Sequence, residues 1–487
     1  MDKAGRSVVP FFFRVLPGGA MMTQVPFIIL AAIAAAVFLW RMKVDPLAVA
    51  FGASVIYFMP GFFGVAQFSY GQHLESYSEP IVPAAYAAMA LVFVALVAVA
   101  LAVDRIRVGP RISLGFEARI PLILLIFAIV AGAISIRNVG VYYLCLDKTI
   151  ILERIDVWYY YASFSVPFCI ATAYRLRQWP IGAVGVLCML ADLYAGFRLV
   201  TAITFISCAM LAEDSLRRGW RNVVAFVAIL AMGGAALFVV KHLIVPAKYG
   251  TASYCDAQIA LDAKIARDAR NPLSAGPVER GREKESLSDQ PRTMSENLSA
   301  TAVNLSHVRF YYSAFVMQSE AFVIQSILNE VVRQDFHTDA GYLVGQILTG
   351  LPLGASLFGI DSSKVVSFNS MMQPALFPRV GFGMANNPWA QAYAAGGEWM
   401  VAVFAFGYAC SLGILSLLFR GSNGALKAIF AVVGAWLGFY FHRNDLFVEA
   451  ILIKHVLYVC GASILAAWVW DWMVPWPKAA QQSIKMD

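Results

Sequence analysis

Long runs of apolar residues constrain this chain more than any other feature of its sequence. A helix that crosses a bilayer needs roughly 20 mostly apolar residues. Only 14% of the residues are charged and 60% are hydrophobic, whereas a soluble domain is about 25% charged and 45–50% apolar. Eleven stretches meet or approach the length of a span: residues 21–40, 46–65, 81–103, 120–136, 157–174, 181–196, 199–213, 222–240, 394–419, 425–441 and 446–470. We therefore predict an all-α polytopic membrane protein with about 11 transmembrane helices, in the range of 10–12.

The distribution of Lys and Arg predicts the orientation. If the spans alternate, fifteen of these cations fall on one side of the membrane and five lie on the short loops of the other side. Cytoplasmic loops carry the excess of Lys and Arg, so the C-terminus is expected in the cytoplasm. The bias also accounts for the net charge of +7, which therefore gives no support to a nucleic-acid partner.

The spans divide the chain into three parts. Residues 1–240 are predicted to form an N-terminal transmembrane bundle of about eight spans, and residues 392–487 a C-terminal bundle of about three. Residues 241–391 form a large loop outside the cytoplasm, with thirteen basic and thirteen acidic residues. Amphipathic helices are expected in this loop. The Gly- and Pro-interrupted stretch 341–359 predicts a re-entrant or interfacial hairpin, because irregular backbone at membrane depth must lie against protein or water.

Cysteine and motif patterns narrow the chemistry. Cys145 and Cys255 both fall on the outer side, where they could form a disulfide or remain free thiols. The sequence contains no P-loop, GxGxxG or HExxH motif and no metal-ligand spacing of histidines. Neither a metal nor another cofactor is predicted.

Ionisable residues at the membrane boundary are the main candidates for function, because they are costly there unless they are paired or face water. Most lie in three places: the turn at Arg198, the cluster His442-Arg443-Asp445, and the segment from Arg379 to Glu398. Each has a structural alternative. Arg198 could extend to the interface or pair with Asp192, Arg443 could pair with Asp445, and Glu398 could be a first-turn acid on a helix dipole. Arg309, beside two tyrosines in the loop, is a further candidate.

Four segments resemble the Wzy-type O-antigen polymerases and the related O-antigen ligases. They are GFRLVTAITFISCAML (196–211), LTGLPLGASLFG (348–359), MANNPWAQAYAAGGEWMVAVFAFGY (384–408) and HRNDL (442–446). The resemblance implies a GT-C-like glycosyltransferase of a bacterial inner membrane, with the large loop in the periplasm. Its function would be to polymerise undecaprenyl-pyrophosphate-linked oligosaccharide repeat units of O-antigen or a related surface polysaccharide, with inversion and without a metal. Membrane lipids, a chain-length regulator and a flippase are the partners that the resemblance suggests.

The expected chemistry assigns roles to the boundary residues. A carboxylate must accept the proton of the acceptor hydroxyl, and Glu398 and Asp445 are the candidates. Cations must stabilise the charge that develops on the pyrophosphate. Because arginine grips phosphate oxygens with a planar fork, the predicted contacts to pyrophosphate or glycan are Arg198, Arg309, Arg379 and Arg443, with His442 beside them.

Two other functions remain open from the sequence. An O-antigen ligase or another lipid-linked-sugar transferase is one, including enzymes with an acidic pair in the first outer loop, here Glu75 and Glu79. Ligases usually carry a His-Asn pair where this chain has Asn386-Asn387, which weakens that alternative. A polysaccharide transporter or flippase is the other, although its charges would more naturally lie near the midplane.

Overall fold

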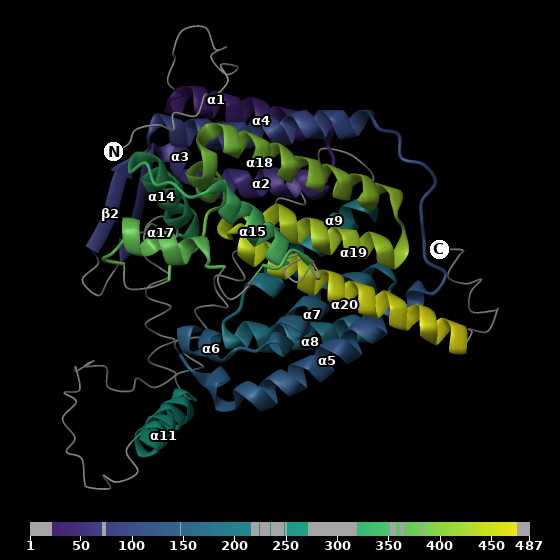
Figure 1. Ribbon diagram of the computed structural model, residues 1–487. Helices are drawn as coiled ribbons and strands as arrows, with labels where there is room; N and C mark the ends of the chain where they lie inside the picture. Colours follow the sequence, from purple (N-terminus) through teal and green to yellow (C-terminus); the bar gives the residue numbers. More distant parts are fainter. Residues whose placement is uncertain are drawn as a thin grey trace.

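The computed structural model describes residues 22–70, 75–146, 148–215, 251–270, 319–350, 357–360, 365–380 and 383–474, and the single residues 224, 234 and 248. Helices dominate these residues, and most of them run roughly parallel in one bundle (Figure 1). Within this part of the chain, six segments are long and apolar enough to cross a membrane: Gln24–Arg41, Pro83–Arg105, Glu117–Leu144, Pro388–Gly421, Gly424–Arg443 and Leu446–Met473. The structure is therefore that of a mainly helical, membrane-embedded protein.

Ten of the eleven predicted spans are helical over much or all of their length, whereas the eighth, at 222–240, lies almost wholly outside the described residues. The helices are α1 (Gln24–Arg41), α2 (Pro46–Tyr57), α4 (Pro83–Arg105), α5 (Ile120–Val139), α7 (Val157–Arg175), α8 (Trp179–Ala195), α9 (Leu199–Ser215), α18 (Pro388–Gly421), α19 (Gly424–Ala435) and α20 (Leu446–Met473). Several are shorter than a full span, so the count of eleven stays a prediction. Helices α8 and α9 are separate, because Gly196 ends α8 in the left-handed conformation, with φ of 100°.

A two-stranded hairpin adds β-structure to the predicted all-α fold. The segment expected to span at 46–65 ends as helix α2 at Tyr57, is followed by the short α3 (Met59–Phe63), and continues into β1 (Val65–Tyr70). Strand β2 (Glu75–Pro80) pairs antiparallel with β1, with Phe68 opposite Tyr77. Phe68 is buried whereas Ser76 and Ser78 are exposed, the alternation typical of a strand with one packed face.

The hairpin lies at the same end of the bundle as two helices of the large loop, α14 (Glu320–Arg333) and α17 (Phe368–Leu376) (Figure 1). We call this end the loop end and the opposite end the tail end. Hydrogen bonds join the hairpin to α14: the Tyr77 hydroxyl donates to Glu330, and the Asn329 side chain bonds the Val82 N–H and the Pro80 carbonyl. The loop end is thus one packed unit.

Cations that the sequence assigned to one side of the membrane lie together at the tail end. Arg41, Lys43 and Arg420 all contact the carboxylate of Asp104, at 2.8–3.3 Å. Because these residues come from α1, its following loop, α18 and α4, the arrangement agrees with the predicted alternation of the spans.

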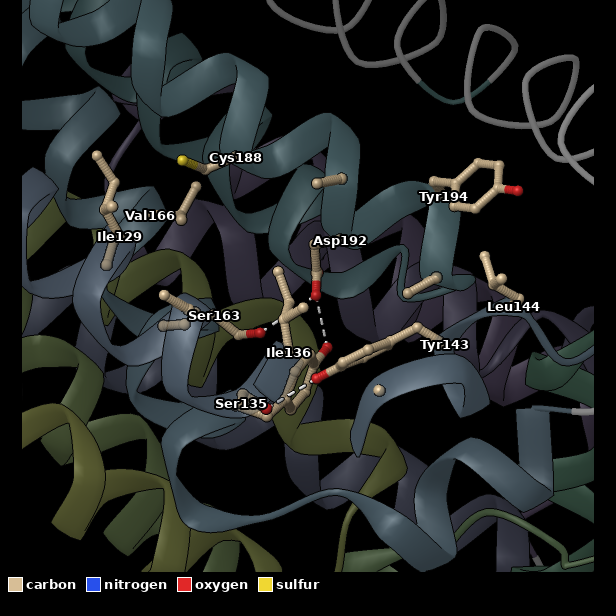
Figure 2. A pocket seen from close by; sticks show the side chains of 18 of the residues that line it. Ile129, Ser135, Ile136, Tyr143, Leu144, Ser163, Val166, Cys188, Asp192 and Tyr194 are labelled. Carbon is tan, nitrogen blue, oxygen red and sulfur yellow. Dashed lines mark hydrogen bonds between the residues drawn. The ribbon is translucent and has the colours of Figure 1, made fainter. Parts of the chain in front are cut away.

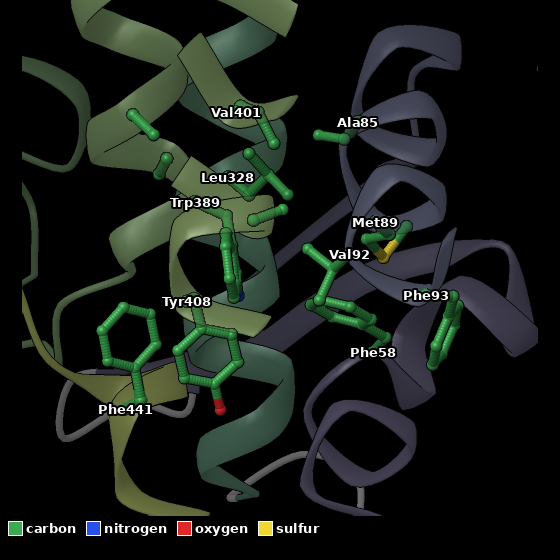
Figure 3. Packing of buried hydrophobic residues seen from close by; sticks show 14 of the residues in the cluster. Phe58, Ala85, Met89, Val92, Phe93, Leu328, Trp389, Val401, Tyr408 and Phe441 are labelled. Carbon is green, nitrogen blue, oxygen red and sulfur yellow. The ribbon is translucent and has the colours of Figure 1, made fainter. Parts of the chain in front are cut away.

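Two apolar cores hold the bundle together, and each contains helices from both predicted transmembrane parts. In the first, α1, α2 and α4 pack against α14 and α18, with Phe58, Phe93, Trp389 and Phe441 among the buried rings (Figure 3). In the second, α5, α7 and α9 pack against α19 and α20. The segments 1–240 and 392–487 therefore share their cores.

The described parts of the large loop are helical, as predicted. Helix α11 (Ala252–Arg270) covers the amphipathic stretch expected there. Helix α15 (Ala340–Gly350) packs along α20, and its Val344 and Ile347 are exposed. An apolar helix beside a spanning helix fits the re-entrant or interfacial segment predicted at 341–359.

A disulfide joins Cys145 and Cys255, which resolves the alternative that the sequence left open. Cys145 follows the short helix η2 (Gly140–Leu144) at the end of α5, and Cys255 lies in the first turns of α11. The bond closes a loop with a sequence separation of 110 residues. It therefore ties the start of the large loop to the bundle.

Replacing either disulfide cysteine, as Cys145→Ser or Cys255→Ser, should lower the thermal stability of the purified protein. A cross-link over about 100 residues restricts the unfolded chain by up to about 4.7 kcal/mol. The measurement is the melting curve in detergent with and without reductant, with the exposed free thiol Cys410→Ser as control. Unchanged melting of both serine variants would show that the bond adds no stability.

Candidate functional site: a cluster of cations at the loop end

Three cations from separate parts of the chain lie near one another at the loop end. Lys148 begins α6 (Lys148–Arg154), Arg198 lies in the turn between α8 and α9, and Arg443 lies in the turn between α19 and α20. The charge of Lys148 interacts with both guanidinium groups and with the carboxylates of Glu320 and Asp192. We call Lys148, Arg198 and Arg443 the cation site. Like charges repel, so this arrangement favours an anionic ligand.

The end of α19 determines where Arg443 lies. The α-helix changes to a π-helical turn over Trp436–Tyr440 and then to a 3-10 turn over Phe441–Arg443. Such π turns occur frequently at functional sites. The guanidinium binds both carboxylate oxygens of Glu320, with Nη1–Oε2 at 3.0 Å and Nη2–Oε1 at 2.7 Å, and lies 4.9 Å from the Tyr440 ring centroid. Arg443 therefore pairs with Glu320 and not with Asp445, which was the structural alternative.

Arg443 and Glu320 remain accessible although they are paired. Their side chains keep 33% and 39% of their surface exposed. A bidentate pair that still reaches water can exchange partners with an incoming anion, since arginine offers further donors. The contact of Glu320 with Arg443 joins α14 to the site.

The neighbours of Arg443 fix the turn rather than face a ligand. His442 is fully buried. Its Nδ1 atom accepts a hydrogen bond from Trp389 Nε1 at 3.0 Å, its Nε2 atom lies 3.1 Å from Ser54 Oγ, and its ring stacks on Tyr57. The prediction that His442 contacts substrate is not supported, because both ring nitrogens are occupied in the core.

Asp445 also has a structural place. It is fully buried, and its Oδ1 atom accepts the Val448 N–H at 2.9 Å as the N-cap of α20. Its Oδ2 atom accepts the Phe368 N–H at 2.7 Å, which holds the start of α17. A carboxylate whose two oxygens bind backbone amides is poorly placed to take a proton from a sugar, so this geometry argues against Asp445 as the base.

Arg198 is exposed in the turn that Gly196 begins. Asp192 is not its partner, because the Oδ1 atom of Asp192 accepts hydrogen bonds from Tyr159 Oη at 2.6 Å and Ser163 Oγ at 3.2 Å. Phe197 is buried beside Arg198, and the Lys148 Nζ atom lies 4.6 Å from the centroid of its ring. The turn therefore positions two of the three cations.

Lys148 is the member of the site that the sequence did not single out. Burial of its ammonium, with the nearby Arg443 and Arg198, lowers the pKa of Lys148 to about 8. The residue is nevertheless exposed, so its ammonium is crowded by protein but still reaches water. Only its position in a short outer loop could have indicated it, and nothing local distinguishes it from an ordinary solvated lysine.

The lowered pKa predicts a pH effect on the free protein. Lys148 is charged below about pH 8 and loses its proton as the pH rises, so anion binding and kcat/KM should fall by about tenfold for each unit above that value. The Lys148→Arg variant keeps its charge at higher pH, so the fall in binding and in kcat/KM should begin at a higher pH in this variant. A pH profile that is the same in both proteins would exclude Lys148 from the site.

Glu398 and Arg379 are not brought into contact with the cation site. Glu398 is exposed on α18, just after a kink at Gly396 and Gly397. Arg379 is exposed after α17. Arg309 lies outside the described residues. Glu79 is one of the two acidic residues in the first outer loop. Its Oε2 atom lies 3.7 Å from Arg333 Nη1 on α14, with which it forms an ion pair.

Within the described part of the chain, no group of three or more His, Cys, Asp and Glu residues could hold a metal ion. The site consists instead of cations, one accessible carboxylate that contacts them, and aromatic side chains.

No family model, curated protein sequence or solved structure matches this chain.

Proposed function

We propose that this protein is a membrane glycosyltransferase that polymerises oligosaccharide repeat units carried on undecaprenyl pyrophosphate, at the periplasmic face of a bacterial inner membrane. The observation that carries the proposal is the placement of Lys148 against Phe197, the residue before Arg198, with Arg443 close enough for its charge to act on Lys148. A diphosphate ester carries more negative charge than the single phosphate of a common phospholipid, and a cluster of cations matches that charge.

The sidedness of the proposal has independent support. The disulfide between Cys145 and Cys255 lies at the loop end, and disulfides persist in oxidising compartments such as the periplasm. The cations shared by Asp104 lie at the opposite end, as expected for the cytoplasmic side.

The proposed reaction is a displacement at the anomeric carbon of the donor. The acceptor hydroxyl oxygen forms the new C–O bond, the bond between that carbon and the pyrophosphate oxygen breaks, and the leaving group departs with the electron pair as undecaprenyl pyrophosphate. The proton of the hydroxyl passes to a carboxylate. Glu320 contacts the cation site and becomes available as a base when Arg443 exchanges it for the pyrophosphate, and Glu398 is the second candidate base.

A gene deletion in the source strain tests this function. Loss of a polymerase should leave lipopolysaccharide core with a single repeat unit, seen as the collapse of the ladder on a gel, and the wild-type gene should restore the ladder. Loss of even the single unit would instead identify a ligase. Accumulation of lipid-linked units on the cytoplasmic face would identify a flippase, and an unchanged ladder would refute all three.

A further inference from the structure

A cavity of about 760 Å³ lies between α5, α7 and α8, next to the cation site (Figure 2). Its volume is within the usual range for ligand pockets. Most of its wall is apolar, and side chains such as Ile129, Ile136, Val166 and Cys188 line it. None of the residues proposed above to bind the head group of a substrate lines this cavity.

The polarity of the cavity changes along its length. Its polar side chains include Tyr143 on η2 and Asp192 near the end of α8, both seen in Figure 2, and Tyr159 in the first turn of α7. The apolar lining continues back to Ile129 on α5. With a rise of 1.5 Å per residue, the stretch from Ile129 to Ile136 extends about 10 Å along α5. A polar mouth above an apolar interior matches the polarity of a lipid.

The polar end of the cavity lies beside the cation site. Tyr159 lines the cavity, and its ring centroid lies 4.8 Å from that of Phe197. The Lys148 ammonium contacts the face of the Phe197 ring, and Arg198 directly follows Phe197 in the chain. The phenol of Tyr159 is held by its hydrogen bond to Asp192. An ionic head group on Lys148 and Arg198 would therefore lie beside this mouth.

The cavity also opens toward the expected lipid phase. Ile129 and Ile136 are 47% and 62% exposed on α5, a helix apolar enough to span the membrane. An apolar chain could therefore enter sideways from the bilayer, without passing through water.

We infer that this cavity holds the first part of the isoprenoid chain of the lipid-linked donor, while its pyrophosphate lies on the cation site. The inference rests on the proposed function. Proximity to Lys148 and Arg198 favours this occupant over a phospholipid acyl chain, because the neighbouring cations suit a head group with more than one negative charge. The chain site would position the anomeric carbon at a fixed distance from the boundary, since the pyrophosphate is anchored on one side and the chain on the other.

Cavity-filling variants test the inference. Gly132 lines the cavity, and a Cβ atom there would meet only the Cβ of Ala162, at 3.8 Å, so the side chain of Gly132→Leu can start at this position without a clash. Ala191→Leu fills the cavity from α8. Ala183→Leu is the matched control, because Ala183 is also exposed on α8 but lies outside the cavity lining.

The measurement is the affinity of the purified full-length chain for undecaprenyl pyrophosphate and for the short-chain dimethylallyl pyrophosphate. Gly132→Leu and Ala191→Leu should each weaken binding of the long chain by at least about tenfold and leave the short-chain affinity and the control unchanged. Unchanged long-chain affinity in both variants would overturn the inference, as would loss of a co-purifying phospholipid instead. If the wild-type protein bound neither pyrophosphate, the proposed function would fail first.

Discussion

Arg198→Ala and Arg443→Ala are each expected to abolish chain extension while leaving the amount of folded protein unchanged. Each charge-assisted hydrogen-bonding pair to phosphate contributes about 1.5–3 kcal/mol. Removing the fork of either arginine should therefore slow transfer by on the order of 100-fold. Arginine binds phosphate with a planar fork and lysine with a point charge, so Arg→Lys should retain part of the activity at either position.

The assay is the length of the surface polysaccharide ladder, together with the amount of protein in the membrane. Arg154→Ala is the matched control, because Arg154 is an exposed cation on the same short helix as Lys148 but pairs with Asp262. Full-length ladders in both alanine variants would rule out the cation site. A short ladder in the control as well would point to a general loss of charge at this end.

Asp445→Ala is expected to destabilise the protein by about 3 kcal/mol. It removes the N-cap of α20, typically worth about 1 kcal/mol, and leaves the buried Phe368 N–H without its acceptor, at a cost of about 1–3 kcal/mol. Asp445→Asn keeps one acceptor oxygen and should lose less. The measurement is the melting curve in detergent, with Asp256→Ala, at an exposed carboxylate of α11, as control.

This prediction separates two roles for Asp445. If the carboxylate is structural, stability and activity fall together in both variants. If Asp445→Asn melted like the wild type but failed to extend the polysaccharide, the carboxylate would be the base after all, and the interpretation of its two backbone hydrogen bonds would be wrong.

The arrangement of helices was largely predictable from the sequence, because apolar run length and the positions of Arg and Lys follow directly from the bilayer as a solvent. The hairpin at 65–80 was not. Alternation in β1 merges with the apolar run before it, so the segment 46–65 looked like a single span. Pro60 lies where α2 has already ended, and it was the local signal that this run is broken.

The site was predictable only in part. Arg198 and Arg443 could be found because a cation in a very short turn between two apolar runs has few structural reasons to be there. His442 and Asp445 looked equally unusual in the sequence. However, His442 accepts a hydrogen bond from Trp389, and Asp445 accepts one from the Phe368 amide. Sequence spacing cannot show which member of a polar cluster faces outward. Lys148 and Glu320 were missed for the opposite reason, since only tertiary packing brings them to Arg443.

The most direct test of the account is the affinity of the purified protein for undecaprenyl pyrophosphate compared with undecaprenyl monophosphate, below pH 8. If Lys148, Arg198 and Arg443 bind the diphosphate together, the pyrophosphate should bind at least about tenfold more tightly. That advantage should disappear when the three cations are replaced together by alanine. Equal affinities for the two lipids in the wild-type protein would contradict the cation site as a pyrophosphate site.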